Sequence, residues 1–343
     1  MPNVTKHNFG AGPCVLPQDV LKKAADAVMN WDEQGLSVLE VSHRSPAFEA
    51  VVKKTETLVR ELLQVPEDYS VLFLQGGASL QFCMVPMNFL RDGATYLDGG
   101  FFGKKAIKEA ELFGPVNRDI TQITGDYFHC TSNNTIEGSQ MKSFPDVPNL
   151  ICDMSSDIFS RPINVSEFAL IYAGAQKNMG PAGMTLVIAR DAFLDDVKHQ
   201  VPAMLDYRVY RDNGSMYNTP PVFAIYAAML NLQWLQSTGG VPAIYKQNKA
   251  KAEMLYAEID RNSLFTGTAS VPERSLMNVT FKTHEPLLEP VFLAYAESKG
   301  LVGIKGYRTV GGFRASLYNA LPLTSVIALV DAMQEFENSN IYG

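Results

Sequence analysis

Apolar residues recur along this chain with two different spacings, and each spacing predicts one type of secondary structure. In the ranges 17–31 and 47–63 they return every three or four positions, which predicts two amphipathic helices. Short runs rich in β-branched and aromatic residues follow and predict strands at 71–74, 95–97, 127–130, 150–152, 170–173 and 185–189. Another helix is expected at 103–113. Because the strand runs are apolar on both faces, we expect an α/β fold in which helices cover a parallel sheet.

The C-terminal part has a different order of elements. Helical spacing at 244–259 is followed by a strand-like run at 277–281, a helical pattern at 287–299, a strand pair around 306–318 and a last helix at 324–337. The chain has 343 residues, which is about twice the usual size of a domain. We therefore expect a second, smaller α/β domain in this part of the chain.

The composition excludes several classes of protein. Hydrophobic residues make up 46% of the chain, which is enough for a large core and excludes a disordered protein. The net charge of −7 is spread without a long block of one sign, which argues against a nucleic-acid partner or a polybasic membrane surface. No apolar run reaches the roughly 18 residues that a membrane helix needs, and the first residues lack the apolar stretch of a signal peptide. We expect a cytoplasmic protein with no nucleic-acid or membrane partner.

Cysteine and histidine spacing gives no sign of a disulfide framework or a metal site. The cysteines lie far apart, form no CxxC pair and are expected to be reduced thiols: Cys14, Cys83, Cys130 and Cys152. The five histidines show neither an HExxH pattern nor another paired spacing. We therefore expect no bound metal ion.

A glycine-rich turn follows the first predicted strand. The sequence Gly76-Gly77-Ala78-Ser79 stands between a strand-like run and a helical pattern. Small residues at the start of a helix leave backbone N–H groups free to bind an anion, and Ser79 adds a hydroxyl. No Lys followed by Ser or Thr comes after the turn, so it is not a P-loop. Taken alone, such a turn is more often structural than functional.

An acid and an amine at the ends of neighbouring predicted strands indicate chemistry more strongly. Asp153 ends the run at 150–152, and Lys177 follows the run at 170–173. Ligands of α/β proteins bind at the carboxyl ends of the strands. Pyridoxal phosphate (PLP) needs a lysine for a Schiff base, a carboxylate that keeps the ring nitrogen protonated and a phosphate site such as the turn at 76–79. The alternative for each residue alone is a surface lysine and an aspartate that caps a strand.

Seven segments carry a resemblance to a known family. Over nearly its whole length the chain resembles the phosphoserine aminotransferases, PLP enzymes of fold-type I, at residues 8–13, 40–44, 133–138, 159–163, 172–183, 212–221 and 311–320. The resemblance implies a mostly parallel sheet of seven strands in a large PLP-binding domain at 14–245. It also implies a small C-terminal α/β domain at 246–343 that includes residues 1–13.

The resemblance implies an activity and an assembly as well. The reaction would be reversible amino transfer between L-glutamate and 3-phosphohydroxypyruvate, giving 2-oxoglutarate and O-phospho-L-serine for serine biosynthesis. Members of the family often also serve pyridoxine biosynthesis through 4-phosphohydroxythreonine, and the sequence does not decide whether this chain does. The implied functional unit is a homodimer that shares its active site across the interface.

Roles in cofactor binding follow from the same resemblance. Lys177 is expected to form the Schiff base and to move a proton between Cα and C4′, and Asp153 to pair with the pyridinium nitrogen. The remaining expected contacts with the cofactor are backbone, hydroxyl, amide and ring groups from both subunits. They are Ala78, Ser79 and Gln176 at the phosphate, Thr135 near the phenolate oxygen or phosphate, Phe102 stacked on the ring, and Asn218 and Thr219 at the phosphate from the partner subunit.

The expected substrate clamps are arginines. The planar guanidinium suits bidentate binding of a carboxylate or phosphate. Arg314 is expected to hold the α-carboxylate that both substrates share. Arg44, helped by His43 and joined by Arg308, is expected to bind the distal group.

The sequence departs from the family in three places. At Phe102 many relatives carry a tryptophan, and at Tyr307 they commonly carry a histidine, which puts the phosphate contact before Arg308 in doubt. The segment 111–127 is shorter than in relatives, where it supplies an extra strand and a loop. Two other types of protein stay open as alternatives. One is a different fold-type I enzyme, such as an alanine–glyoxylate transaminase or a cysteine desulfurase, and the other is a non-catalytic dimeric binding protein.

Overall fold

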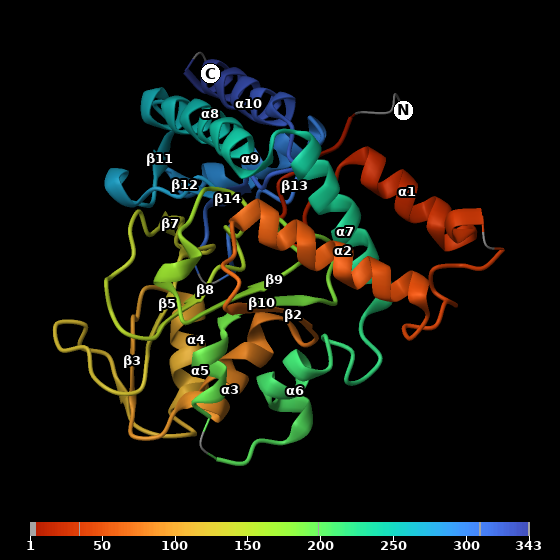
Figure 1. Cartoon of the computed structure of the whole chain (residues 1–343). Coiled ribbons are helices and arrows are strands. Elements are labelled where there is room, and N and C mark those ends of the chain that lie inside the picture. Colours follow the sequence, from red (N-terminus) through yellow and green to blue (C-terminus); the bar gives the residue numbers. More distant parts are fainter. Residues whose placement is uncertain (1–4, 34, 198, 309, 342–343) are drawn as a thin grey trace.

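A central sheet of seven strands organises the molecule (Figure 1). The computed structural model describes residues 5–33, 35–197, 199–308 and 310–341. The strand order is β2 (Tyr69–Leu74), β10 (Thr185–Arg190), β9 (Leu170–Gly174), β8 (Leu150–Asp153), β5 (Phe128–Thr131), β3 (Ala94–Tyr96) and β4 (Val116–Asn117). Only β10 runs antiparallel to its neighbours, and the other adjacent pairs are parallel. The expected mostly parallel α/β sheet is confirmed.

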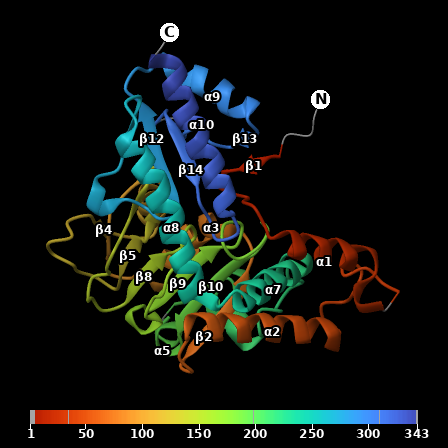
Figure 2. The same cartoon turned by 90° about the horizontal axis from the view of Figure 1, so that it is seen from above.

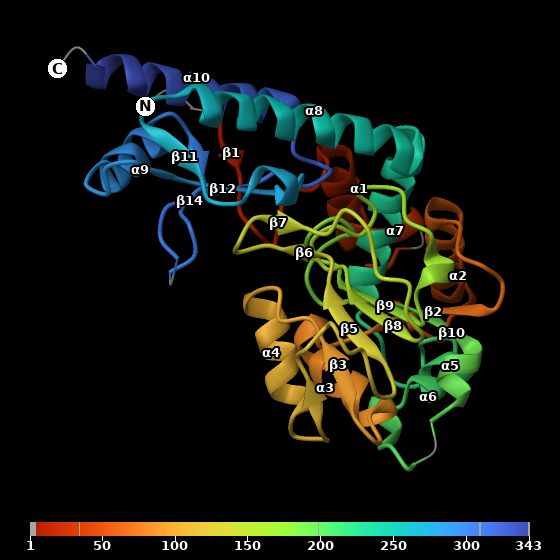
Figure 3. The ribbon, with the colours of Figure 1, turned by 90° about the vertical axis from the view of Figure 1, so that its left-hand side faces the viewer.

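Helices cover both faces of this sheet, which explains why its strands are apolar throughout. Along β2, Val71 and Phe73 belong to one core cluster, whereas Leu72 and Leu74 belong to another on the opposite face. The first cluster packs under α1 (Gln18–Met29), α2 (Pro46–Leu63) and α7 (Val222–Ser237). The second packs under α3 (Gly77–Phe89), α4 (Phe101–Ala110), α5 (Asp191–Asp195) and α6 (Tyr207–Asp212), which lie together below the sheet in Figure 3.

The antiparallel strand β10 has a consequence for the position of Lys177. Antiparallel strands need no crossover helix, so the connection from β9 to β10 is the short segment 175–184. This segment starts at the carboxyl end of β9, next to the carboxyl end of β8, which is Asp153 itself. The topology therefore brings Lys177 and Asp153 to one edge of the sheet.

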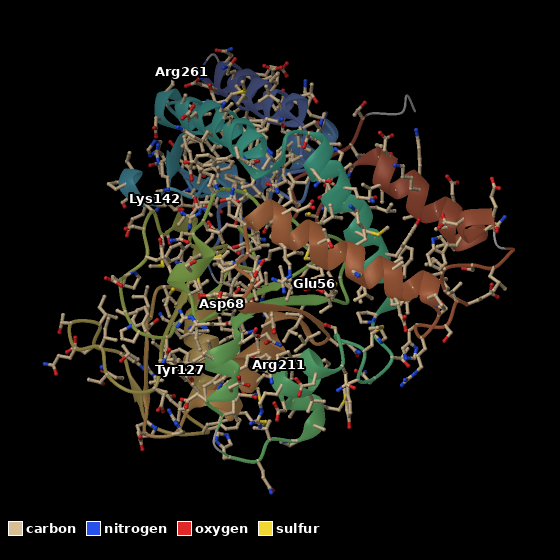
Figure 4. The ribbon with its side chains drawn as sticks, viewed as in Figure 1. Glu56, Asp68, Tyr127, Lys142, Arg211 and Arg261 are labelled. Carbon is tan, nitrogen blue, oxygen red and sulfur yellow. The ribbon has the colours of Figure 1, made fainter. Side chains whose placement is uncertain are left out.

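The C-terminal third builds a smaller layered unit (Figure 2). Its antiparallel sheet consists of β11 (Phe265–Gly267), β12 (Asn278–Thr283) and β14 (Phe313–Ser316). The helices α8 (Gly240–Arg261), α9 (Leu288–Ser298) and α10 (Leu323–Ile341) pack against it around a third core cluster. Near the outer end of α8 (Figure 4), Arg261 binds Glu258 and Glu337 at 2.7 Å each and so links α8 to α10.

The N-terminal segment joins this smaller unit. The strand β1 (His7–Asn8) pairs in parallel with β13 (Leu301–Val302), and Phe9 is fully buried in the third core cluster. The boundaries proposed from the sequence, 14–245 and 246–343 with 1–13, stay a prediction. Among the described helices, none is long and apolar enough to cross a membrane.

Two expectations from the sequence need correction. The helix expected at 103–113 is α4, which begins at Phe101 and ends at Ala110. The strand pair expected around 306–318 is a single strand, β14, with one isolated bridge between Lys305 and Phe313. Residues 304–306 do pair with β14, through hydrogen bonds from the N–H of Gly306 to Gly312 at 2.9 Å and from the N–H of Arg314 to Ile304 at 2.7 Å, but this pairing is too short to form a second strand. Thr309 of this segment lies outside the described residues.

The short segment at 111–127 keeps a strand despite its length. Its residues Val116–Asn117 form β4, which pairs with β3 at the edge of the sheet. Asp126 closes the segment by accepting hydrogen bonds from the N–H groups of Arg91 and Asp92 at 2.6 and 2.9 Å. The segment 111–127 therefore supplies the edge strand of the sheet.

Candidate active site

Lys177 lies in the turn after β9, and its amine is surrounded by a hydroxyl group, an aromatic ring and charged side chains. Its Nζ donates a hydrogen bond to Oγ1 of Thr135 at 3.0 Å. It also lies 5.5 Å from the centre of the Phe102 ring. Burial lowers the pKa of Lys177 to about 8; Asp153 opposes this shift and the charge of Arg314 adds to it. A lysine with a lowered pKa has more of the neutral amine that a nucleophile or base requires.

Removing this amine is expected to stabilise the cofactor-free protein at neutral pH. A lysine whose pKa falls on folding, here from 10.5 to about 8, destabilises the fold below pH 8, and this cost disappears as the pH rises towards 10.5. Lys177→Met should therefore raise the free energy of unfolding at pH 7 by about 1–2 kcal/mol, allowing for partial exposure of the side chain. Urea unfolding of the wild type and of Lys177→Met at neutral and alkaline pH measures this gap in the free energy of unfolding, which should narrow above pH 8. A gap that widens with pH contradicts a lowered pKa.

Asp153 is a buried carboxylate at the edge that Lys177 also occupies. Only 4% of its surface is exposed. Its Oδ1 accepts a hydrogen bond from the backbone N–H of Ser155 at 2.9 Å. Burial raises the pKa of Asp153, while Ser155 and the charge of Lys177 act in the opposite direction. A buried carboxylate with one backbone donor still has capacity for a cationic partner, and a protonated ring nitrogen is such a partner.

The expected phosphate cradle is a helix N-terminus that no side chain caps. Helix α3 begins at Gly77, directly after the left-handed Gly76, where φ is +86°. A Cβ on Gly76 would lie 2.5 Å from the side chain of Leu80, so this turn requires glycine. The first-turn N–H groups, including those of Ala78 and the exposed Ser79, have no acceptor within the helix. They can bind an anion.

Aromatic residues form a wall beside the reactive amine. Phe102 lies in the first turn of α4, half-buried, with its ring perpendicular to that of Phe101 at 5.4 Å. The ring of Tyr307 packs on Phe101 from the other side, with the centres 5.2 Å apart. Tyr307 therefore packs on the aromatic wall, and the next residue, Arg308, is exposed. Tyr307 thus has a packing role of its own in this structure.

Arg314 is a half-buried arginine whose charge acts on Lys177. It lies on β14 and is half-buried, and its buried Nε has no hydrogen-bond partner among the described residues. Burial lowers the pKa of Arg314, against the opposing effects of Tyr318 and Tyr307. Its charge also contributes to the lowered pKa of Lys177, so the two groups share one site. An unpaired, partly buried guanidinium is suited to hold an anionic ligand.

The structure does not bring the other expected residues to the amine. His43 and Arg44 lie in the loop before α2, and the buried Nε2 of His43 has no partner among the described residues. Asn218 and Thr219 precede α7, and the carbonyl oxygen of Thr219 accepts a hydrogen bond from Nε2 of Gln75 at 3.1 Å. Gln75 directly precedes the cradle, so Thr219 lies near it within the same chain.

Gln176 takes part in a contact that the sequence does not reveal. Its carbonyl oxygen accepts a hydrogen bond from the N–H of Cys14 at 3.1 Å. The thiol of Cys14 donates to the carbonyl oxygen of Lys177, and burial raises the pKa of this thiol to about 12. The N-terminal segment therefore braces the lysine turn across 163 positions of sequence. No spacing pattern could have predicted this contact.

A second buried carboxylate supports the strand end below Asp153. Asp157 accepts hydrogen bonds from Ser132, from Nε2 of Gln140 at 3.1 Å and from the guanidinium of Arg161 at 3.2 Å. Ser132 also donates to the carbonyl oxygen of Asp153 at 3.1 Å. Asp157 therefore fixes the backbone that carries Asp153. The resemblance at 159–163 pointed to this region without giving it a role.

The fold brings Lys177 and Asp153 to one edge of the sheet, and comparison with known proteins shows that the chain is a PLP-dependent transferase. The family model for aminotransferase class-V matches residues 6–98 and 126–329. The chain is 52% identical to the phosphoserine aminotransferase of Bacteroides thetaiotaomicron, over 97% of this chain and 99% of that protein. The chain belongs to the class-V aminotransferase family.

Solved structures extend the likeness to three dimensions. The phosphoserine aminotransferase from Bacillus circulans superposes with a TM-score of 0.94 at 42% identity, covering 98% of this chain and 99% of that one. The PLP-bound phosphoserine aminotransferase from Trichomonas vaginalis gives 0.92 at 39% identity, covering 96% and 100%. This protein is therefore a PLP-dependent aminotransferase.

Proposed function

We propose that this enzyme transfers an amino group reversibly between L-glutamate and 3-phosphohydroxypyruvate, giving 2-oxoglutarate and O-phospho-L-serine in serine biosynthesis. The observation that carries the proposal is the site itself: an amine with a lowered pKa beside a buried carboxylate and an unpaired arginine. The relatives named phosphoserine aminotransferase match this chain over nearly its whole length. We place the reaction in the cytoplasm.

PLP, when bound, withdraws electrons from Cα of the substrate and carries the amino group between the two half-reactions. Lys177 anchors it and then holds or returns the proton at the substrate's Cα, a task that suits a pKa of about 8. Asp153 keeps the ring nitrogen protonated. Burial strengthens this pairing because the effective dielectric constant around Asp153 is low.

The remaining cofactor contacts come from elements that meet at this edge of the sheet. The N–H groups of Ala78 and Ser79, with the Ser79 hydroxyl and Gln176, bind the phosphate. Thr135, which accepts a hydrogen bond from Lys177, would bind the cofactor near its phenolate oxygen or phosphate. Phe102 packs against the ring, with less area than a tryptophan would give.

We further propose a homodimer whose subunits complete each other's sites. Arg44 and His43 lie in the loop before α2, where no contact with Lys177 is found among the described residues, and would serve the partner's site together with Asn218 and Thr219. Large apolar side chains are exposed in and beside that loop: Met29 by 82%, Leu36 by 49% and Leu39 by 60%. Exposed apolar side chains that gather in one segment are consistent with an interface.

Arg308 is expected to recognise the phosphate group of phosphoserine. Both substrates carry an α-carboxylate, which we assign to Arg314, but phosphoserine ends in a dianion with more acceptor oxygens than the distal carboxylate of glutamate. Arg308→Ala should lower kcat/KM for phosphoserine more than for glutamate, by about 1–3 kcal/mol of transition-state stabilisation. Tyr307 would weaken this effect if its ring, which packs on Phe101, displaced Arg308 from the pocket.

Steady-state kinetics with both substrates on this one variant decide the assignment. Equal losses of kcat/KM for phosphoserine and glutamate would mean that Arg308 does not recognise the phosphate group. The function as a whole is tested by glutamate formation from O-phospho-L-serine and 2-oxoglutarate, with L-alanine as the competing donor. Faster transfer from alanine would favour an alanine–glyoxylate type of enzyme, and no transfer at all would favour a binding protein.

A further inference from the structure

Lys251 is a buried lysine that the transamination chemistry does not use. It lies on α8 with 2% of its surface exposed. Its Nζ donates three hydrogen bonds, to the carbonyl oxygens of Leu317 at 2.9 Å, Tyr318 at 2.8 Å and Leu321 at 3.1 Å. No acidic side chain among the described residues forms an ion pair with it, and burial lowers the pKa of Lys251 to about 7. An apolar side chain of this size would avoid the desolvation cost, so the three bonds point to a specific task.

These bonds clamp the turn 317–321, which immediately follows β14. One turn earlier on α8, Nδ2 of Asn248 donates to Oδ1 of Asn319 at 2.9 Å. The N–H of Asn319 in turn donates to Oδ1 of Asn178 at 3.0 Å. Lys251 and Asn248 therefore fix the turn on the side of α8. Asn319, which belongs to this turn, fixes Asn178 through its hydrogen bond.

The clamped turn connects two groups of the active site. Asn178 is the neighbour of Lys177 in the chain, and its own backbone is held by Asn231, whose Nδ2 donates to its carbonyl oxygen at 3.0 Å. On the other side, the turn continues from the strand that carries Arg314. Lys177 lies at the edge of the central sheet, whereas Arg314 lies on β14 of the smaller unit. The turn 317–321 links the two residues, because it is covalently continuous with β14 and hydrogen-bonded to Asn178 beside Lys177.

We propose that Lys251 is a positioning residue for transamination, which fixes the amine of Lys177 relative to the guanidinium of Arg314 through the turn 317–321. The inference rests on the proposed function. In that function Arg314 holds the α-carboxylate of the substrate, and Lys177 moves the proton at Cα of the same substrate. A displacement of about 1 Å between such groups costs on the order of 100-fold in rate.

Lys251→Met tests this, because methionine fills the space without donating hydrogen bonds. In the PLP-loaded enzyme we expect kcat/KM for O-phospho-L-serine to fall about 10- to 100-fold. The visible absorption band should persist, since Asp153 and the α3 turn lie outside the network. Its titration without substrate should move to higher pH, because a displaced Arg314 no longer disfavours a positive charge on the Lys177 nitrogen. Lys249→Met, an exposed lysine on the same helix, should change neither quantity.

Asn319→Ala gives an independent variant, since it breaks the link to Asn178 and leaves Lys251 in place. It should show the same two effects, and the double variant should lose no more than the stronger single one, because both act through one turn. The proposal is overturned if Lys251→Met leaves both kcat/KM and the titration of the visible band unchanged. If Lys251→Met does not fold, the same result in Asn319→Ala overturns it. The titration needs no substrate, so it separates this outcome from failure of the proposed function.

Discussion

Lys177→Ala should abolish amino transfer and leave the fold intact. The side chain is half-buried and makes one hydrogen bond, to Thr135, so its removal takes little from the packed core. It removes both the anchor of the cofactor and the group that moves the proton, and general acid–base catalysis alone contributes about 100- to 10,000-fold. We expect kcat/KM to fall at least about 1,000-fold and the visible band that depends on the link to Lys177 to vanish.

Circular dichroism and absorption on the same sample check this result. The far-ultraviolet spectrum should match that of the wild type, and Lys104→Ala, which removes an exposed lysine from α4, should keep both activity and colour. Turnover near the wild-type rate would mean that another amine carries the cofactor.

Asp153→Asn should weaken cofactor binding and slow the half-reaction with glutamate by orders of magnitude. The asparagine keeps the size of the side chain but cannot form an ion pair with a protonated ring nitrogen. Asp153 is 4% exposed, and breaking a buried charge pair typically costs about 3–5 kcal/mol. The change is measured by PLP titration and by stopped-flow absorption after glutamate is added.

The exposed Asp146 gives a matched control, since Asp146→Asn removes one negative charge from the loop before β8. It should leave both measurements within experimental error. If Asp153→Asn slows the half-reaction by less than about fivefold, or about 1 kcal/mol, the partner of the ring nitrogen is a different residue.

The sequence predicted the sheet, and the placement of Lys177 and Asp153 at one edge of it, for a physical reason. Strands buried on both faces are apolar at every position, and this pattern is local. The carboxyl ends of β8 and β9 meet because these strands are parallel neighbours, so two residues far apart in the chain fall at one edge. The glycine pair at 76–77 likewise marked the start of α3, because only glycine fits that backbone.

Other parts of the site depend on contacts with no local signature. The bond from Cys14 to Lys177, and the clamp of Lys251 on the turn 317–321, join segments that share no pattern of spacing. The expected strand pair at 306–318 is reduced to one bridge, between Lys305 and Phe313. The roles given to Arg44, His43, Asn218 and Thr219 depend on a second subunit, and they stay predictions.

One measurement tests the central claim most directly: absorption of the PLP-loaded protein during titration with O-phospho-L-serine. If the enzyme is a phosphoserine transaminase, the visible band disappears in a single saturable transition as the amino group moves to the cofactor. Addition of 3-phosphohydroxypyruvate or 2-oxoglutarate then restores the band. A band that O-phospho-L-serine leaves unchanged, while L-alanine removes it, would contradict the assignment of the substrate.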